Sequence, residues 1–427
     1  MRFTVFSKRS SPLALALALG MGGVLSVTAL EAPAAAQKKK KDGDEAAKPQ
    51  YSKAFIAAYN PVQTQFDQGT DIAAVKAALP GMIAAVENND DRFVAGNFTY
   101  SVGTKASDRS LQRQGIAMML ESGKVPAANQ PQYNFLAGQY AYQDRDFSAA
   151  RSYLEQAVAL GYAENDPAAL IAETYFAEDR FADGVTYLSQ AIEAKRQAGQ
   201  PVDEAWIKRG LAMAYNNQLD QQARDYAAMY VRDYPSDTSW GDAIGILYNT
   251  ADVSGQDSLD LLRLARRVNG IRQANQYLEY VEQADPRKLP GEVVAVIDEG
   301  YSSGMLDRSN SFVSEARAEA ARRVKIDETE LPELARDARA SNANLATVMA
   351  AGDAYLSYGR GAEAEEFYAK ASAMSGANTP LVLTRMGIAQ LDQGKYSEAE
   401  ATFNKVQGAR QAIANLWAIY ATQQAGS

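Results

Sequence analysis

The sequence predicts an all-α fold, an α-solenoid of antiparallel helix pairs, from three observations. Beyond residue 51, apolar residues recur at helical spacing almost throughout, and clusters of Gly, Pro, Asn and Asp break the runs. We find no convincing run of the alternating apolar and polar residues that is typical of a strand. A short pattern also recurs at intervals of 34 or 35 residues, as expected when a chain grows by stacking equivalent units.

The composition excludes most familiar catalytic chemistry. The 427 residues include no Cys and no His. The chain therefore has no thiolate nucleophile, no imidazole base and no Cys or His ligand for zinc. The formal net charge is −9, and an acidic chain lacks the basic surface that nucleic acid requires. We expect a protein that is not an enzyme, with no cofactor, no metal and no nucleic-acid partner.

The first residues predict export. Basic residues precede an apolar run at residues 13–27, and small side chains follow up to Ala36, so residues 1–36 are interpreted as a secretory signal peptide. Cleavage would leave the protein in the periplasm without an integral membrane span. The alternative is an uncleaved segment that anchors the chain in the inner membrane. The basic run Lys38–Lys41 conflicts with simple export, because such residues oppose translocation. Residues 37–50 are charge-rich and predict a flexible linker.

The recurring pattern is clearest near the C-terminus. Ala399 is followed by Phe403 four residues later and preceded by Gly387 twelve residues earlier. A small residue on the first helix of a pair would let the second helix approach closely, and the large residue would fill the space between neighbours. Equivalent anchors occur at Ala150, Gly184, Ala223 and Ala364. For Ala223 the upstream small residue is Ala212, which lies eleven residues earlier and indicates a one-residue slip.

These segments resemble tetratricopeptide repeats. The usual pattern of that family has a small residue and an aromatic three later, then Ala, an aromatic and Ala in the second helix. The best copy spans residues 350–371, where Gly352, Tyr355, Ala364 and Tyr368 occupy the matching places. The chain is thus similar to an exported bacterial member of the family. The resemblance implies a superhelix whose concave face binds a protein or an extended peptide.

The repeats divide the rest of the chain. We expect degenerate helical repeats at 51–130, clear repeats at 131–235, degenerate repeats at 236–340, and clear repeats with a C-terminal capping helix at 341–427. Within the third range, residues 240–250 resemble a first helix of a pair. Spacing from Ala223 to Ala364 is close to four units, so helical pairs are expected there rather than an inserted domain.

By the same resemblance, binding residues lie on the first helix of each pair, at positions that face the concave groove. The candidates are Gln139, Tyr142, Glu173, Phe176, Met213, Asn216, Asp353 and Leu356. The expected function is a non-catalytic protein-protein interaction scaffold of the bacterial cell envelope. Self-association through the ends of the solenoid is a further hypothesis.

Two short motifs suggest enzymes. Residues 300–304, GYSSG, match the nucleophile elbow of serine hydrolases. Because the chain has no His to serve as the base, we expect Ser302 and Ser303 to end a helix and Gly304 to follow in a turn. Glu121, followed by Ser122, resembles the catalytic Glu of lytic transglycosylases. The alternative function is therefore a carboxylate-dependent, glycan-cleaving enzyme of the envelope with a helical superhelix.

Overall fold

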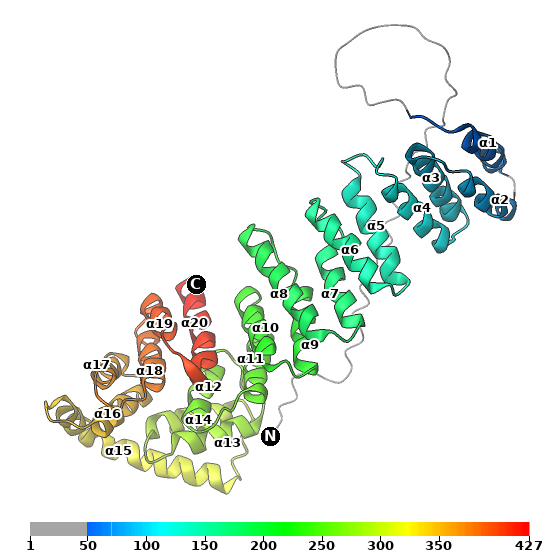
Figure 1. Cartoon of the computed structure of the whole chain (residues 1–427). Helices are drawn as coiled ribbons and strands as arrows, with labels where there is room; N and C mark the ends of the chain where they lie inside the picture. The colour runs from blue at the N-terminus through cyan, green and yellow to red at the C-terminus, as the bar shows by residue number, and fades with distance from the viewer. Residues whose placement is uncertain (1–48, 70, 427) are drawn as a thin grey trace. The chain divides into compact units, whose positions relative to one another are not determined.

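The computed structural model describes residues 49–69 and 71–426, and within them every regular element is a helix, twenty of the α type and one 3-10 helix (Figure 1). The all-α prediction is confirmed. The predicted signal peptide and the Lys38–Lys41 run lie outside the described residues. Among the helices that are described, none combines the length and low charge needed to cross a bilayer. The chain divides into an N-terminal unit, residues 49–188, and a C-terminal unit, residues 189–426.

The N-terminal unit is a succession of helices in which each packs on the one before it up to α7. Its helices are α1 (Lys53–Asp67), α2 (Ile72–Ala84), α3 (Asn89–Lys105), α4 (Arg109–Glu121), α5 (Gln130–Gln143), α6 (Phe147–Ala159) and α7 (Pro167–Ala177), and α8 (Phe181–Gln197) contains the unit boundary. The closest crossing is between α3 and α4. A Cβ on Gly115 would lie 2.5 Å from the carbonyl oxygen of Gly96, so only glycine permits this approach.

The C-terminal unit is built of the remaining helices. These are α9 (Glu204–Asn216), α10 (Asp220–Asp233), α11 (Asp237–Thr250), α12 (Gln256–Arg267), α13 (Ala274–Ala284), α14 (Pro290–Ser302), α15 (Ser311–Arg339), α16 (Leu345–Ser357), α17 (Gly361–Ser372), α18 (Thr379–Leu391), α19 (Tyr396–Phe403), the 3-10 helix η1 (Gly408–Arg410) and α20 (Gln411–Ala425). The long α15 packs on both α14 and α16. The region between the two sets of clear repeats is therefore helical, and it contains α11 to α14 followed by the single long helix α15.

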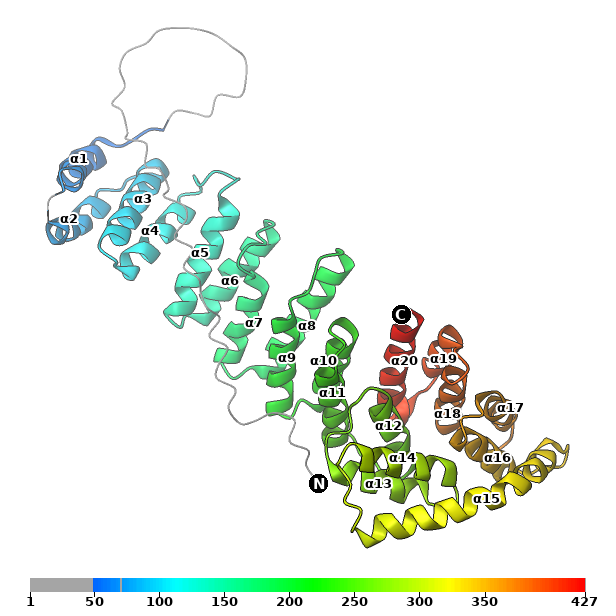
Figure 2. The same ribbon diagram turned by 180° about the vertical axis from the view of Figure 1, so that it is seen from behind.

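The last helix closes the C-terminal unit on itself. α20 packs on α19, its neighbour in sequence, and also on α10, α12 and α18 (Figure 2). The Gln423 amide donates to the carbonyl oxygen of Val231 on α10, and the indole of Trp417 donates to the carbonyl oxygen of Asp260 on α12, at 2.7 and 3.1 Å. Helices far apart in the sequence are thereby joined through α20.

The small-to-large packing expected from the repeat is present in the structure. A Cβ on Gly138 would lie 2.6 Å from Cγ of Leu154, and one on Gly387 would lie 2.5 Å from the ring of Phe403. The same relation links Gly352 to Tyr368. Each glycine thus makes room for a large side chain sixteen residues later.

One register assignment is wrong. In the α9–α10 pair, the small residue that meets a ring is Gly210, where a Cβ would lie 2.1 Å from Tyr226, and not Ala212. The interval between Gly210 and Tyr226 is again sixteen residues. The slip arose because the position twelve residues after Gly210 is Gln222, whereas the alanine that matches the pattern, Ala223, lies one residue later.

Candidate functional site

Helix α12 carries two charged residues into the core of the C-terminal unit. Leu259, Leu261, Leu262 and Leu264 point to different sides of the helix, and all four are fully buried. A helix with this pattern must be enclosed by neighbours. Asp260 and Arg263 share the helix with these leucines, so they are buried as well, with 0% and 5% of their surface exposed. Charges in such a place require partners.

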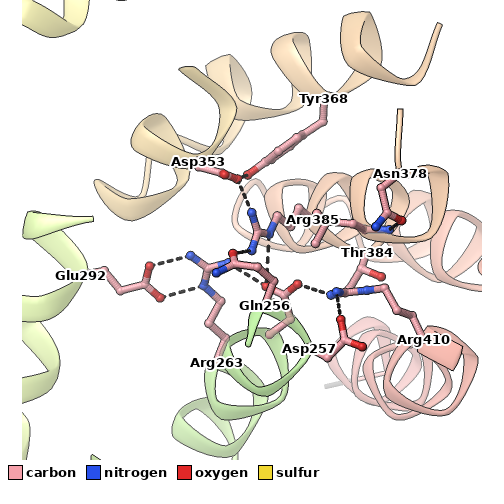
Figure 3. Close-up of polar contacts among 12 residues, drawn as sticks. Gln256, Asp257, Arg263, Glu292, Asp353, Tyr368, Asn378, Thr384, Arg385 and Arg410 are labelled. Atoms are coloured by element: carbon pink, nitrogen blue, oxygen red, sulfur yellow. Dashed lines mark hydrogen bonds and ion pairs between the residues drawn. The ribbon is translucent and has the colours of Figure 1, made fainter. Parts of the chain in front are cut away.

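Arg263 binds two carboxylates. Its Nε and one terminal nitrogen donate to the two oxygens of Glu292 on α14, at 2.8 and 2.6 Å, in a bidentate pair (Figure 3). The other terminal nitrogen donates to Asp260 at 2.7 Å. The hydroxyl of Tyr280 on α13 donates to the same Glu292 at 2.5 Å. Helices α12, α13 and α14 are therefore held together by one polar group of residues.

Two further arginines reach Asp260 from the C-terminal part of the chain. Arg385 on α18 donates to Asp260 at 3.4 Å and to Asp353 on α16 at 2.7 Å. Arg410 at the end of η1 donates to Asp260 and to Asp257 (Figure 3). Both arginines are buried. We call these residues the Asp260 cluster; it comprises Asp257, Asp260, Arg263, Tyr280, Glu292, Asp353, Arg385 and Arg410.

The electrostatics of the Asp260 cluster favour the charged forms. Burial alone would raise the pKa of Asp260, but the guanidinium groups of Arg385, Arg263 and Arg410 outweigh burial and hold that pKa below its ordinary value. Burial likewise opposes ionisation of Glu292, yet its contacts with Arg263 lower the pKa of this carboxyl. Burial raises the pKa of Tyr280 well above its ordinary value, so this residue remains a hydrogen-bond donor.

A cavity of about 440 Å³ adjoins the Asp260 cluster. Helices α12, α13, α14, α16 and α18 contribute to its wall. Arg266 pairs with Glu299 at 2.6 Å, and Arg267 pairs with Asp392 at 2.5 Å. Since Glu292 is held by Arg263, each carboxylate that lines this cavity is neutralised by an arginine. Such pairing stabilises an arrangement of helices, and it leaves these carboxylates poorly suited to act as bases.

A second hollow of about 560 Å³ lies where α20 meets α10 and α11, and we call it the α10–α20 groove. One wall comes from α10, α11 and the segment that follows α11; the other comes from the end of α19, η1 and α20. Buried apolar residues underlie it, namely Ala227, Ala243, Leu247, Phe403, Ile413 and Leu416. Arg410 of the Asp260 cluster immediately precedes α20, so the cluster fixes one wall of the groove.

The polar side chains of the α10–α20 groove differ between its walls. On α10, Arg224 donates to the carbonyl oxygen of Thr250 and to Gln221, at 2.6 and 2.8 Å. Gln221 in turn donates to Asp225 at 2.9 Å. On the other wall, three exposed carboxamides make no hydrogen bond through their side chains to any part of the chain that the structure describes. These are Asn404, Gln411 and Asn415.

The eight residues predicted from the repeat are scattered. In the N-terminal unit, Gln139, Tyr142 and Glu173 are half-buried on α5 and α7, whereas Phe176 is buried with its ring where a Cβ on Gly184 would point. In the C-terminal unit, Met213 is half-buried and Asn216 exposed, Asp353 belongs to the Asp260 cluster, and Leu356 lines the cavity. None of the eight lines the α10–α20 groove.

The two enzyme-like motifs occupy helix ends. Val293 and Ile297 lie within α14, which ends at Ser302, and the hydroxyl of Ser302 donates to the carbonyl oxygen of Asp298 at 2.7 Å. Gly304 follows with a left-handed φ of 71°. The helix-end interpretation of GYSSG is confirmed. Glu121 is the exposed last residue of α4 and does not line either hollow.

The Asp260 cluster was not predicted from the sequence, and the sequence of α12 explains why. Gln256, Asp260, Arg263 and Arg267 follow one another at helical spacing. Such a polar stripe is typical of a solvated helix face, so it does not indicate a buried ion pair. The partners of Asp260, Arg385 and Arg410, are 125 and 150 residues away in sequence, and no local pattern identifies them.

No protein-family model and no curated protein matches the chain. Among solved structures, Naa15/Naa10 bound to HypK-THB is similar over 86% of this chain and 67% of that one, with 11% identity and a TM-score of 0.31. The complex Cut9–Hcn1 of the APC/C matches over 87% and 69%, with 12% identity and a TM-score of 0.23. Maize PPR10, a pentatricopeptide repeat protein, matches over 84% and 51%, with 12% identity and a TM-score of 0.26.

Proposed function

We propose that the protein is a non-catalytic scaffold that binds a segment of a partner protein in the α10–α20 groove. The observation that carries this proposal is the groove itself. Its volume of about 560 Å³ falls within the usual range for binding sites. Its walls come from segments far apart in sequence, and Arg410 of the buried Asp260 cluster holds η1, which leads into the α20 wall. A groove fixed before binding requires little ordering when the partner arrives.

A binding role also agrees with the chemistry of the chain. The sequence offers no His and no Cys, and the carboxylates of the adjoining cavity are each held by an arginine. We infer that these pairs serve the shape of the unit rather than a reaction. The cellular place that we propose is the periplasm of a bacterium, because of the signal-like residues 1–36. Anchoring to the inner membrane by the same segment is the alternative.

We propose the predicted first-helix positions of each unit, taken separately, as second contact regions. In the N-terminal unit the region consists of Gln139, Tyr142 and Glu173, which are half-buried, and in the C-terminal unit of Met213 and Asn216. Half-buried tyrosine is common at protein interfaces because one end of the side chain is apolar and the other polar. Phe176 and Leu356 are buried in packing and are not included.

The proposal is tested by filling the groove. Ala412 lies half-buried on the α20 wall, so Ala412→Trp would occupy the space with an indole. The matched control is Ala369→Trp, at an exposed alanine of α17 that lines neither hollow. Tagged full-length proteins are purified from the native cell envelope and their co-purifying partners identified by mass spectrometry.

The expected result is a partner that the wild type and Ala369→Trp recover and that Ala412→Trp loses. Circular dichroism and the unfolding midpoint establish that both variants are folded. Recovery of the same partners by all three proteins would contradict binding in the groove. Loss of the partner from Gln139→Ala/Tyr142→Ala, with no effect of Ala412→Trp, would assign the interaction to the first-helix surface instead.

A further inference from the structure

The partner segment can be described further from the hydrogen-bonding capacity of the α10–α20 groove, an inference that rests on the proposed function. The side chains of Asn404, Gln411 and Asn415 each carry two donor hydrogens and an acceptor oxygen. They are exposed and bond to no other described part of the chain through those groups. A partner that covers them must satisfy them, because a polar group buried without a hydrogen bond is costly.

An extended peptide backbone meets this requirement. Each residue of such a backbone offers one N–H and one C=O, the complement of a carboxamide. A helical segment offers few of these groups, because its backbone is bonded internally. Side chains at the positions of Gln411 and Asn415, four residues apart on α20, are separated by about 5–6 Å. Residues two apart in an extended chain are separated by about 6.6 Å, so alternate residues of the peptide match the two carboxamides.

The opposite side of the groove favours a cationic segment. Asp225 and Asp252 are exposed and form no salt bridge with any residue that the structure describes. Asp257, which also lines the groove, is compensated by Arg410. Arg224 is the basic residue of the lining, and its guanidinium already donates to Thr250 and Gln221. Two carboxylates without a salt bridge, against one engaged arginine, leave an excess of negative charge at this rim.

Small residues on both walls leave space for a main chain to approach. Ala228 on α10 and Ala412 on α20 are half-buried and line the groove. We propose that the α10–α20 groove binds an extended peptide segment that carries Lys or Arg. The carboxamides of Asn404, Gln411 and Asn415 pair with its backbone, and Asp225 and Asp252 pair with its cations. Recognition by backbone groups would give affinity, and the two carboxylates would select for charge.

The test uses two matched pools of synthetic peptides about ten residues long, enough to span roughly 33 Å when extended. One pool has Lys at alternate positions and random residues elsewhere, and the other has Glu at the same positions. Immobilised full-length protein is exposed to both pools at low salt. The expected result is at least a several-fold enrichment of the Lys pool, reduced by added salt and lost in Asp225→Asn/Asp252→Asn.

A second measurement addresses the backbone. The best-retained Lys peptide is compared with versions that are N-methylated at single backbone nitrogens. Removal of one backbone donor at a contacted position is expected to weaken binding about tenfold, from the usual contribution of one hydrogen bond. Gln411→Ala/Asn415→Ala should weaken binding of the parent peptide to a similar degree, whereas Asn342→Ala, at an exposed amide outside the groove, should leave it unchanged.

Equal retention of the two pools, no retention of either, or no effect of any N-methylation would overturn this inference. The proposed function is judged separately, by whether Ala412→Trp loses the native partner. A partner lost in that variant, together with equal retention of Lys and Glu pools, would leave a groove-binding scaffold whose partner is not an extended basic segment.

Discussion

The cavity beside the Asp260 cluster and the α10–α20 groove are both lined by polar residues, but their polar groups are used differently. In the cavity, Glu292, Glu299 and Asp392 are each bound by an arginine. In the groove, Asp252 and three carboxamides have no partner among the described residues. The comparison shows that polar lining residues alone do not make a hollow a binding site. Satisfied groups hold helices together, whereas exposed groups without partners are available to a ligand.

The largest effect that we expect is a loss of folding stability when the Asp260 cluster, rather than the α10–α20 groove, is altered. Asp260→Asn keeps the shape of the side chain but removes the negative charge shared by Arg263, Arg385 and Arg410. We expect a loss of about 3–5 kcal/mol in the free energy of unfolding, as for other buried pairs that lose one partner. The measurement is denaturant unfolding, followed by circular dichroism and by the fluorescence of the neighbouring Trp417.

The control for this substitution is Asp252→Asn at the rim of the groove. It removes an exposed charge without a salt bridge, and we expect a change within about 0.5 kcal/mol. Similar unfolding midpoints for the two variants would show that the Asp260 cluster does not hold the C-terminal unit together.

The next largest effect that we expect is a loss of folding stability at acidic pH, because the carboxylates of the Asp260 cluster become protonated. The pKa values of Asp260 and Glu292 are lowered in the folded protein by their arginines. Unfolded Asp and Glu titrate near pH 3.9 and 4.3, so the unfolded chain takes up protons first. The stabilisation is therefore fully present above about pH 5 and is lost as pH falls through the lowered folded-state pKa values. Unfolding free energy measured across this range should fall steeply in the wild type and less steeply in Asp260→Asn. Equal slopes of unfolding free energy against pH in the two proteins would contradict a stabilising role for the charge of Asp260.

A smaller effect is expected at Tyr280. The Tyr280→Phe substitution removes the hydroxyl that donates to buried Glu292 and keeps the ring. A hydrogen bond to a charged group contributes about 1.5–3 kcal/mol, and the bidentate pair with Arg263 remains, so we expect a loss near the lower end of that range. Denaturant unfolding measures it, with Tyr301→Phe, at a half-buried tyrosine of α14, as the comparison. An unchanged midpoint would indicate that Arg263 alone satisfies Glu292.

The smallest expected effects on stability come from replacing the carboxamide side chains of Gln276 and Gln411. Gln276 is buried, and its side-chain oxygen accepts from the backbone N–H groups of Arg272 and Gln273, at 2.7 and 3.1 Å. We expect Gln276→Ala to cost about 1–2 kcal/mol, and Gln411→Ala in the groove to cost less than about 0.5 kcal/mol. Thermal unfolding of the two single variants gives the comparison. A large loss from Gln411→Ala would mean that its amide has a structural role and is not reserved for a partner.

The sequence predicted the helix pairs because the repeat is local. Gly138 with Leu154 and Gly387 with Phe403 stand at one fixed interval, and the side chains meet as the interval implies. The same reasoning failed at Ala212, because Ala223 lies one residue out of step with the repeat, and the ring of Tyr226 fixes the register on Gly210.

The functional surfaces were harder to predict, for a physical reason. A repeat describes the contact of each helix with the next one, and the α10–α20 groove is made by helices that are not consecutive. Its wall residues Arg224 and Gln411 are separated by most of the C-terminal unit. The resemblance to tetratricopeptide repeats directed attention to first-helix positions, two of which, Phe176 and Leu356, are buried. Positions on α20 were expected only to cap the last repeat.

The closure of α20 onto α12 has a consequence for the order of folding. Asp260 is synthesised 150 residues before Arg410, which binds it in the finished structure. At about 5–20 residues per second, translation separates the two by roughly 8–30 seconds. During that time Asp260 and Arg263 are better placed in water than in a dry core that lacks its third arginine. The ion pairs of the Asp260 cluster can therefore be completed only after Arg410 has been made, and we expect the C-terminal unit to reach its final packing late in folding.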